Sequence, residues 1–97
     1  MIELTAKEMD VVTAILEKHL PGMHVRAFGP RARGNAKPDA DLDLCVMNEQ
    51  PLPFDQVSEL MEDFANAGLS FTVDICEWAI TGGEMRKRIE REAKVLM

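Results

Sequence analysis

The residues best suited to chemistry in this 97-residue chain are aspartates that follow a basic, glycine-flanked turn. Residues 28–34 read Phe-Gly-Pro-Arg-Ala-Arg-Gly, and Asp41-Leu42-Asp43-Leu44 follows after a short polar segment. Strand positions two apart share a face and lie roughly 6.5 to 7 Å apart, so Asp41 and Asp43 can bind one cation or a close pair of cations. Carboxylate oxygens favour Mg²⁺, which completes its coordination with water and substrate phosphates. The pattern predicts a site for a metal-bound nucleotide.

A third aspartate, Asp74, is expected beside the first two. Phe71, Val73 and Ile75 alternate with polar residues, which predicts a strand with Asp74 opposite its apolar side. The strand, helix and strand expected within residues 41–76 form a βαβ unit, whose two strands are parallel and joined by a right-handed crossover. Asp74 would be a third metal ligand or the base that takes a proton from an attacking hydroxyl. The alternative is that these acids only keep a sheet edge soluble.

The turn at residues 29–34 is not a standard phosphate-binding motif. It has the frame of a Walker A loop, but Asn35 and Ala36 stand where Lys and Ser or Thr are required. Arg31 and Arg33 give the turn a positive charge just before the aspartates, which suits a polyphosphate next to metal ions. The alternative is an ordinary glycine turn with solvated arginines.

Three helices and three strands are expected along one domain spanning residues 1–97. A capping box at Thr5 and Glu8 opens the first helix, Asp55 caps the second, and a capping-box pattern from Thr81 to Glu84 opens the third. Pro21-Gly22 and Gly68 are expected to end the first two helices. The third helix has an apolar seam of Met85, Ile89, Ala93 and Leu96. The strands are predicted at residues 24–28, 41–46 and 71–76.

Composition excludes several classes of protein. The chain is 46% hydrophobic and 29% charged, with no apolar run near the roughly 20 residues that a membrane helix needs. Its net charge of −6 makes nucleic-acid binding an unfavourable interpretation. The N-terminal residues lack the bases and the apolar segment of a secretory signal, so a cytoplasmic location is expected. Cys45 and Cys76 lie in apolar runs and are expected to be reduced thiols that line the core rather than zinc ligands.

The glycine turn and the aspartates together resemble a known family. Gly29-Pro30, ten intervening residues, Asp41-Leu42-Asp43-Leu44 and the later Val73-Asp74-Ile75 are similar to the motifs of the polymerase-β-like nucleotidyltransferases, specifically the minimal nucleotidyltransferase (MNT) domains. The resemblance spans essentially the whole chain. It implies an α/β fold with a small mixed sheet of three or slightly more strands and helices packed on one face. The first strand would run antiparallel to the other two.

The resemblance also implies roles for individual residues. The family transfers a nucleoside monophosphate from an NTP to a hydroxyl and uses Mg²⁺; here ATP is the expected donor, and two ions are expected. By position, Asp41, Asp43 and Asp74 correspond to the catalytic metal ligands. The nucleotide-binding set would be Gly29, Pro30, Arg31 and Arg33.

The resemblance implies a partner as well. Minimal members often act as the antitoxin beside a helical HEPN toxin, in some cases by adenylylating it. A departure at Pro30, where the family has serine, removes a hydroxyl and a backbone N–H that would face the triphosphate. The second hypothesis is therefore a nucleotidyltransferase-fold antitoxin that is catalytically weak or inactive and neutralises its partner by binding. The sequence leaves homo-oligomerisation open.

Overall fold

The computed structural model describes residues 2–97, which form a four-stranded sheet with helices on both faces. The strand order is β3-β2-β1-β4, so β2 and β1 are central and β3 is an edge strand. The strands are β1 (Val25–Phe28), β2 (Leu42–Val46), β3 (Val73–Glu77) and β4 (Lys94–Val95). The helices are α1 (Ala6–His19), α2 (Pro30–Arg33), α3 (Phe54–Ala65), the 3₁₀ turn η1 (Trp78–Ile80) and α4 (Gly83–Glu92).

The directions of the strands confirm the mixed sheet. β1 runs antiparallel to β2 and β4, whereas β2 and β3 are parallel and connected through α3. The βαβ unit expected within residues 41–76 is therefore present, with the alternation that was predicted for both of its strands. Leu42, Leu44 and Val46 join the larger core, while Cys45 belongs to a smaller cluster on the opposite face.

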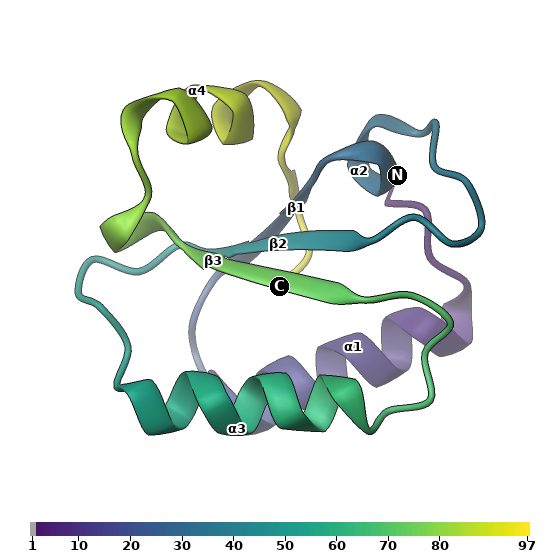
Figure 1. Cartoon of the computed structure of the whole chain (residues 1–97), viewed down its shortest axis with the longest axis horizontal. Helices are drawn as coiled ribbons and strands as arrows, with labels where there is room; N and C mark the ends of the chain where they lie inside the picture. The colour runs from purple at the N-terminus through teal and green to yellow at the C-terminus, as the bar shows by residue number, and fades with distance from the viewer. Residues whose placement is uncertain (1) are drawn as a thin grey trace.

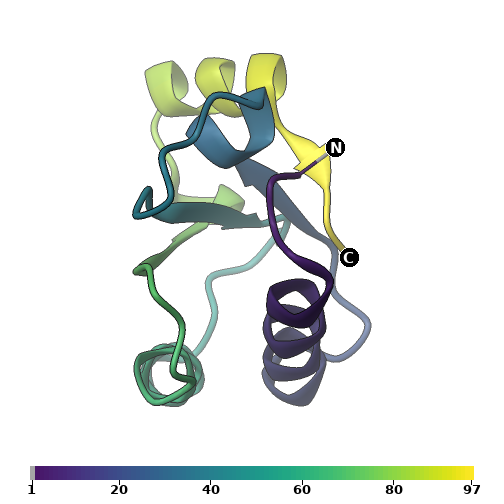
Figure 2. The same cartoon turned by 90° about the vertical axis from the view of Figure 1, so that its right-hand side faces the viewer.

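Both faces of the sheet are covered, which corrects the expectation of helices on one face. Figures 1 and 2 show α1 and α3 side by side under the sheet, with α4 on the other side. The larger core lies between the sheet and the pair α1 and α3. The smaller cluster, Phe28, Cys45 and Ile89, packs α4 against the other face. Among residues 2–97, no helix has the length and apolar composition needed to cross a bilayer.

The helix ends agree with the sequence only in part. Thr5 caps α1 with the predicted reciprocal hydrogen bonds to Glu8. The caps predicted at Asp55 and Thr81 are wrong, because α3 already begins at Phe54 after Pro53, and the Thr81 hydroxyl donates to the carbonyl of Glu77. Proline fixes its own φ at a value that suits the entry to a helix, and the hydrogen bond to Glu77 directs the Thr81 side chain back toward η1, so that Gly82 and not Thr81 is the N-cap of α4.

The last helix is shorter than the apolar seam suggested. α4 ends at Glu92, the backbone of Ala93 is extended, and Lys94 and Val95 form a strand that pairs with Ala27 and Arg26. Ile89 and Ala93 of the predicted seam pack in the smaller cluster, whereas Leu96 packs against the larger core on the other face. Pairing with β1 is favoured over one more helical turn for these residues, because the backbone N–H and C=O groups on the outer edge of β1 would otherwise have no partner in the sheet.

Arg31, in α2, is a structural residue whose side chain holds the loop that precedes β2. Its side chain is buried, and its guanidinium donates to the carbonyls of Glu3, Pro38 and Ala40 at 2.8, 3.0 and 2.8 Å. The same group lies 4.1 Å from the ring centroid of Phe71, a favourable cation–π contact. These contacts hold three separate segments together, so the turn, the N-terminus and the approach to β2 form one unit.

Arg31→Met should lower the free energy of unfolding by about 2–4 kcal/mol, because three carbonyls lose a charged donor. Arg26→Met is the matched control, since Arg26 is exposed on β1 and should change stability by no more than about 0.5 kcal/mol. Urea unfolding followed by circular dichroism measures both. Equal stabilities for the two variants would contradict the structural role of Arg31.

Candidate active site

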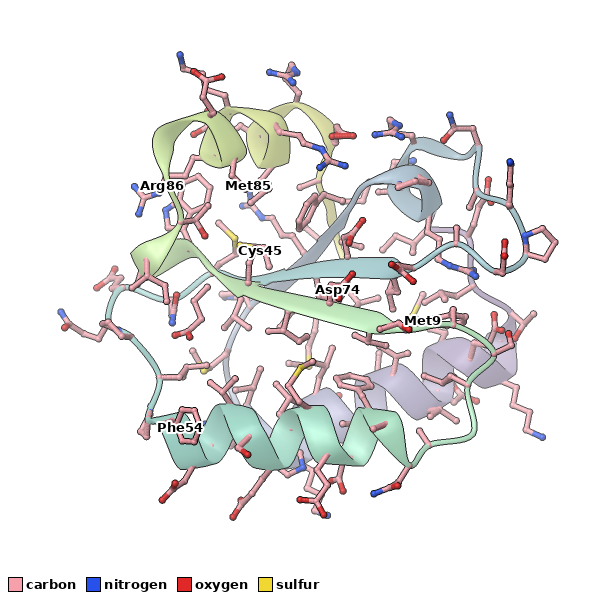
Figure 3. All side chains as sticks on the ribbon, viewed as in Figure 1. Met9, Cys45, Phe54, Asp74, Met85 and Arg86 are labelled. Atoms are coloured by element: carbon pink, nitrogen blue, oxygen red, sulfur yellow. The ribbon has the colours of Figure 1, made fainter. Side chains whose placement is uncertain are left out.

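Asp43 and Asp74 lie directly beside each other on neighbouring strands. The parallel register pairs Asp43 of β2 with Asp74 of β3. Val73 and Ile75 contact the larger core, so Asp74 points to the opposite face, on which α4 lies. Figure 3 shows Asp74 on β3 and Cys45 between the sheet and α4. The side-by-side arrangement predicted from the βαβ pattern is present.

Gly29 forms the opposite wall of this carboxylate site. Phe28 pairs with Asp43 across β1 and β2, and Gly29 follows immediately with φ 75°. A Cβ atom at Gly29 would lie 2.3 Å from Oδ2 of Asp43. Both the backbone angle and the space therefore require glycine at this position. The close approach puts the backbone of the turn next to the carboxylate of Asp43.

The other two predicted carboxylates act electrostatically on Asp43. Burial raises the pKa of Asp43, and the charges of Asp74 and Asp41 raise it further, although Arg88 opposes them. Asp41 itself is exposed just before β2. Like charges gathered in this way repel one another unless a cation joins them.

The donor set suits a hard divalent cation, but the acids are not drawn together around one point. Among residues 2–97, no three acids, histidines or cysteines form a closed cluster able to hold a metal ion. The fit to Mg²⁺ therefore rests on chemistry: carboxylate oxygens on adjacent strands, with mutual repulsion that a cation would relieve.

A cavity of about 420 Å³ opens beside Asp41, between α3 and the beginning of β3. Its walls combine the apolar side chains Phe64, Leu69 and Phe71 with the acids Asp39 and Asp41. The volume falls in the range typical of sites for small groups. Of the three predicted carboxylates, Asp41 lines this cavity, whereas Asp43 and Asp74 do not.

The basic turn differs in detail from the sequence prediction. Pro30 is the first residue of α2, and its carbonyl accepts from the N–H of Gly34. Arg31 makes the backbone contacts described above, so its guanidinium is committed to the fold. Arg33 is half-exposed and forms an ion pair with Glu92 of α4. Of the two arginines predicted to contact phosphate, only Arg33 has a guanidinium available at the surface.

Sequence reasoning missed two charged residues of α4 near the site. Arg88 donates through Nε to Oε2 of Glu92 at 2.8 Å, and both residues act electrostatically on Asp43. The spacing of Arg88 and Glu92 is i, i+4, which the sequence shows as an ordinary helical ion pair. That spacing could not predict that α4 packs close to β2, so neither residue was expected near Asp43.

Two thiols continue the row of aspartates along the sheet. Cys45 and Cys76 are paired in register and are not in a disulfide, which agrees with the predicted free thiols. The interaction of the two thiols, together with burial, raises the pKa of Cys45, and the same interaction lowers the pKa of Cys76 to about 7. Next along the chain, Trp78 packs under the guanidinium of Arg86, which lies 4.5 Å from the ring centroid. Trp78 therefore closes the end of the strand.

Comparison with known proteins identifies the family. Residues 7–97 match the family described as "Polymerase beta, Nucleotidyltransferase". The chain belongs to this family. It is 36% identical to the probable protein adenylyltransferase MntA of Haemophilus influenzae over 90 residues, which cover 93% of this chain and 79% of that protein.

Solved structures agree with the nucleotidyltransferase fold. A minimal nucleotidyltransferase is 30% identical, with a TM-score of 0.69 over 91% of this chain and 88% of that chain. A toxin-antitoxin structure with AMP-PNP has a TM-score of 0.77 at 20% identity and covers 92% of this chain and 72% of that chain. A complex of a tri-AMPylated Shewanella oneidensis HEPN toxin with an MNT antitoxin has a TM-score of 0.70 at 19% identity, covering 92% and 68%.

In this nucleotidyltransferase, Gly29→Ala should destabilise the fold by about 1–3 kcal/mol more than Gly22→Ala, as measured by urea unfolding. Gly22 has nearly the same φ, 77°, but nothing lies within 4 Å of an added Cβ there. The difference between the two variants isolates the approach to Asp43 from the backbone angle. Equal losses would show that the close approach is not a constraint.

Asp43→Asn should make the metal-free protein more stable than wild type at pH 7, because the substitution removes a charge that burial and Asp74 disfavour. The folded-state pKa of Asp43 is raised, so the contribution of Asp43 to stability is most favourable below its unfolded pKa of about 4 and is lost as pH rises through the folded pKa. The gain from Asn should therefore grow with pH above about 4 and then level off. Thermal unfolding in EDTA from pH 4 to 8 measures it, and a pH-independent difference would contradict the assignment.

Proposed function

We propose that this protein is a Mg²⁺-dependent nucleotidyltransferase that transfers AMP from ATP to a hydroxyl of a partner protein. The observation that carries the proposal is the register of β2 and β3, which sets Asp43 beside Asp74, with Gly29 against Asp43. Phosphoryl chemistry of this kind depends on positioning and on charge stabilisation more than on unusual side chains. The site has both carboxylates and a backbone that can come close to a phosphate.

Asp41, Asp43 and Asp74 are the residues that would hold Mg²⁺, with two ions proposed. When bound, the metal would neutralise phosphate charge and favour the ionised form of the attacking hydroxyl. The raised pKa of Asp43 supports this assignment, because a cation at the site would offset the repulsion from Asp74 and Asp41.

The chain's own residues would position the reacting groups. Asp74 is exposed on the edge strand β3, where a hydroxyl from a second protein can reach it. In the proposed step, Asp74 accepts the hydroxyl proton as the oxygen forms a bond to the α-phosphorus. The bond from that phosphorus to the bridging oxygen breaks, and pyrophosphate leaves with the electron pair. Glycine at position 29 lets the phosphate lie close to the backbone of the turn.

The proposed partner is a helical HEPN-type toxin, with this protein as the antitoxin in the cytoplasm. The relative named as a probable protein adenylyltransferase supports transfer to protein, and the complex of an AMPylated HEPN toxin with an MNT antitoxin supports the choice of partner. ATP is the proposed donor, supported by the toxin-antitoxin structure with AMP-PNP.

Pro30 favours a second candidate, an antitoxin that neutralises its partner by binding alone. Proline at the first position of α2 has no N–H to offer a phosphate, so the turn has one donor fewer. Each donor lost to a charged oxygen costs about 1–3 kcal/mol of binding. In this second candidate, the fold is kept and the transfer is lost.

Incubation with α-labelled ATP, Mg²⁺ and the HEPN partner should place label on the partner. Asp43→Asn should lower the rate of labelling at least about 100-fold, because the carboxylate acts on the charged reacting centre. Asp10→Asn is the matched control, since Asp10 is an exposed acid on α1, and it should label the partner as wild type does.

The same variants separate the two candidates. If wild type transfers no label although it binds the partner, and Asp43→Asn protects cells from the toxin equally well, neutralisation occurs by binding alone. Loss of label on addition of EDTA, with recovery in excess Mg²⁺, is the expected result for the metal-dependent reaction. Undiminished labelling in EDTA would contradict the metal assignment.

A further inference from the structure

Glu92, at the end of α4, holds two arginines from different elements. One carboxylate oxygen contacts Arg33 from α2, and the other accepts from Nε of Arg88 at 2.8 Å. The side chain of Glu92 is only 11% exposed, whereas those of Arg33 and Arg88 are 42% and 37% exposed. Burial alone would raise the pKa of Glu92, but the hydrogen bonds from Arg33 and Arg88 outweigh it and lower the pKa. Glu92 is therefore an ionised anchor beneath two accessible guanidiniums.

The two guanidiniums lie at the rim of the carboxylate site. Arg88 lies 5.4 Å from the ring centroid of Phe28, the residue that precedes Gly29 and pairs with Asp43. Its charge also acts directly on Asp43, where it opposes the effect of burial and of Asp74. Arg33 ends the turn that begins at Gly29. Both arginines therefore frame the side of the site on which α4 lies.

Arg33, Arg88 and Glu92 together carry one net positive charge, because two arginines share one carboxylate. This charge lies beside the aspartates, since Arg88 acts electrostatically on Asp43. A guanidinium carries five N–H donors, and within residues 2–97 Arg33 and Arg88 donate side-chain hydrogen bonds only to Glu92. The remaining donors are free for a doubly charged oxygen group. Planar guanidiniums bind phosphate oxygens in a fixed, often bidentate geometry.

We propose that Arg88 and Arg33 together bind the β- and γ-phosphates of the nucleotide, and that Glu92 is the positioning residue that holds both arginines at the rim. This inference rests on the proposed function and extends it by assigning a polyphosphate-binding role to α4. In this proposal, Arg88 takes the phosphate-binding role that the sequence predicted for Arg31, because the guanidinium of Arg31 already donates to backbone carbonyls.

The test measures binding of inorganic tripolyphosphate with Mg²⁺, using calorimetry on the intact chain. Arg88→Gln should weaken binding by about 10- to 100-fold, because a charge-assisted contact is lost. Glu92→Gln should weaken it about 3- to 10-fold, because the arginines keep their charge but lose their anchor. Arg91→Gln is the matched control, since Arg91 is exposed on the same helix and should bind as wild type does.

Arg88→Lys keeps the positive charge, and it serves as a control for the possibility that Arg88→Gln loses binding only because it misfolds. It should bind tripolyphosphate better than Arg88→Gln and less well than wild type, because an ammonium lacks the planar fork. In the transfer assay, Glu92→Gln should raise KM for ATP more than it lowers kcat. Binding by both Arg88 variants within twofold of Arg91→Gln would overturn the proposal. A wild-type protein that binds tripolyphosphate through Arg88 but labels no partner would instead overturn the proposed function and leave this site intact.

Discussion

The position of β2 between two different neighbours is the constraint on which the site depends. Its parallel pairing with β3 places Asp43 beside Asp74, and its antiparallel pairing with β1 places Asp43 against Gly29. Because strand side chains alternate, a shift of one residue on either side would turn the carboxylate into the core. The buried residues Leu42 and Leu44 prevent such a shift. The hydrophobic core thus fixes the arrangement of charges.

Positive charge near the aspartates is divided between two tasks. Arg31 is buried and connects the N-terminal segment, the turn and the approach to β2, so its charge stabilises the fold. Arg33 and Arg88 lie at the surface and share Glu92. Residues that look equivalent in the turn therefore differ in environment, since one is enclosed by carbonyls and the other reaches a second helix.

The sequence predicted the parts of the site that depend on local periodicity. Alternation in residues 41–46 and 71–76 placed Asp43 and Asp74 on one face, and the capping box at Thr5 was present as expected. It could not show that Arg31 is enclosed, because Pro38 and Ala40 become its partners only when the loop closes. Arg88 and Glu92 were missed for the same reason, since their approach to β2 depends on how α4 packs. The helix end at Glu92 was set by strand pairing rather than by propensity.

Pro30 has a second consequence besides the missing donor. The pyrrolidine ring fixes φ near −65°, which already suits the first position of a helix, so the free chain samples fewer shapes at this turn. Proline at a compatible position typically stabilises a protein by about 0.4–1 kcal/mol through the entropy of the unfolded state. A turn that is rigid before its ligand arrives loses less freedom on binding. At the proposed phosphate site, the rigidity of Pro30 would therefore offset part of the binding free energy lost with its N–H donor.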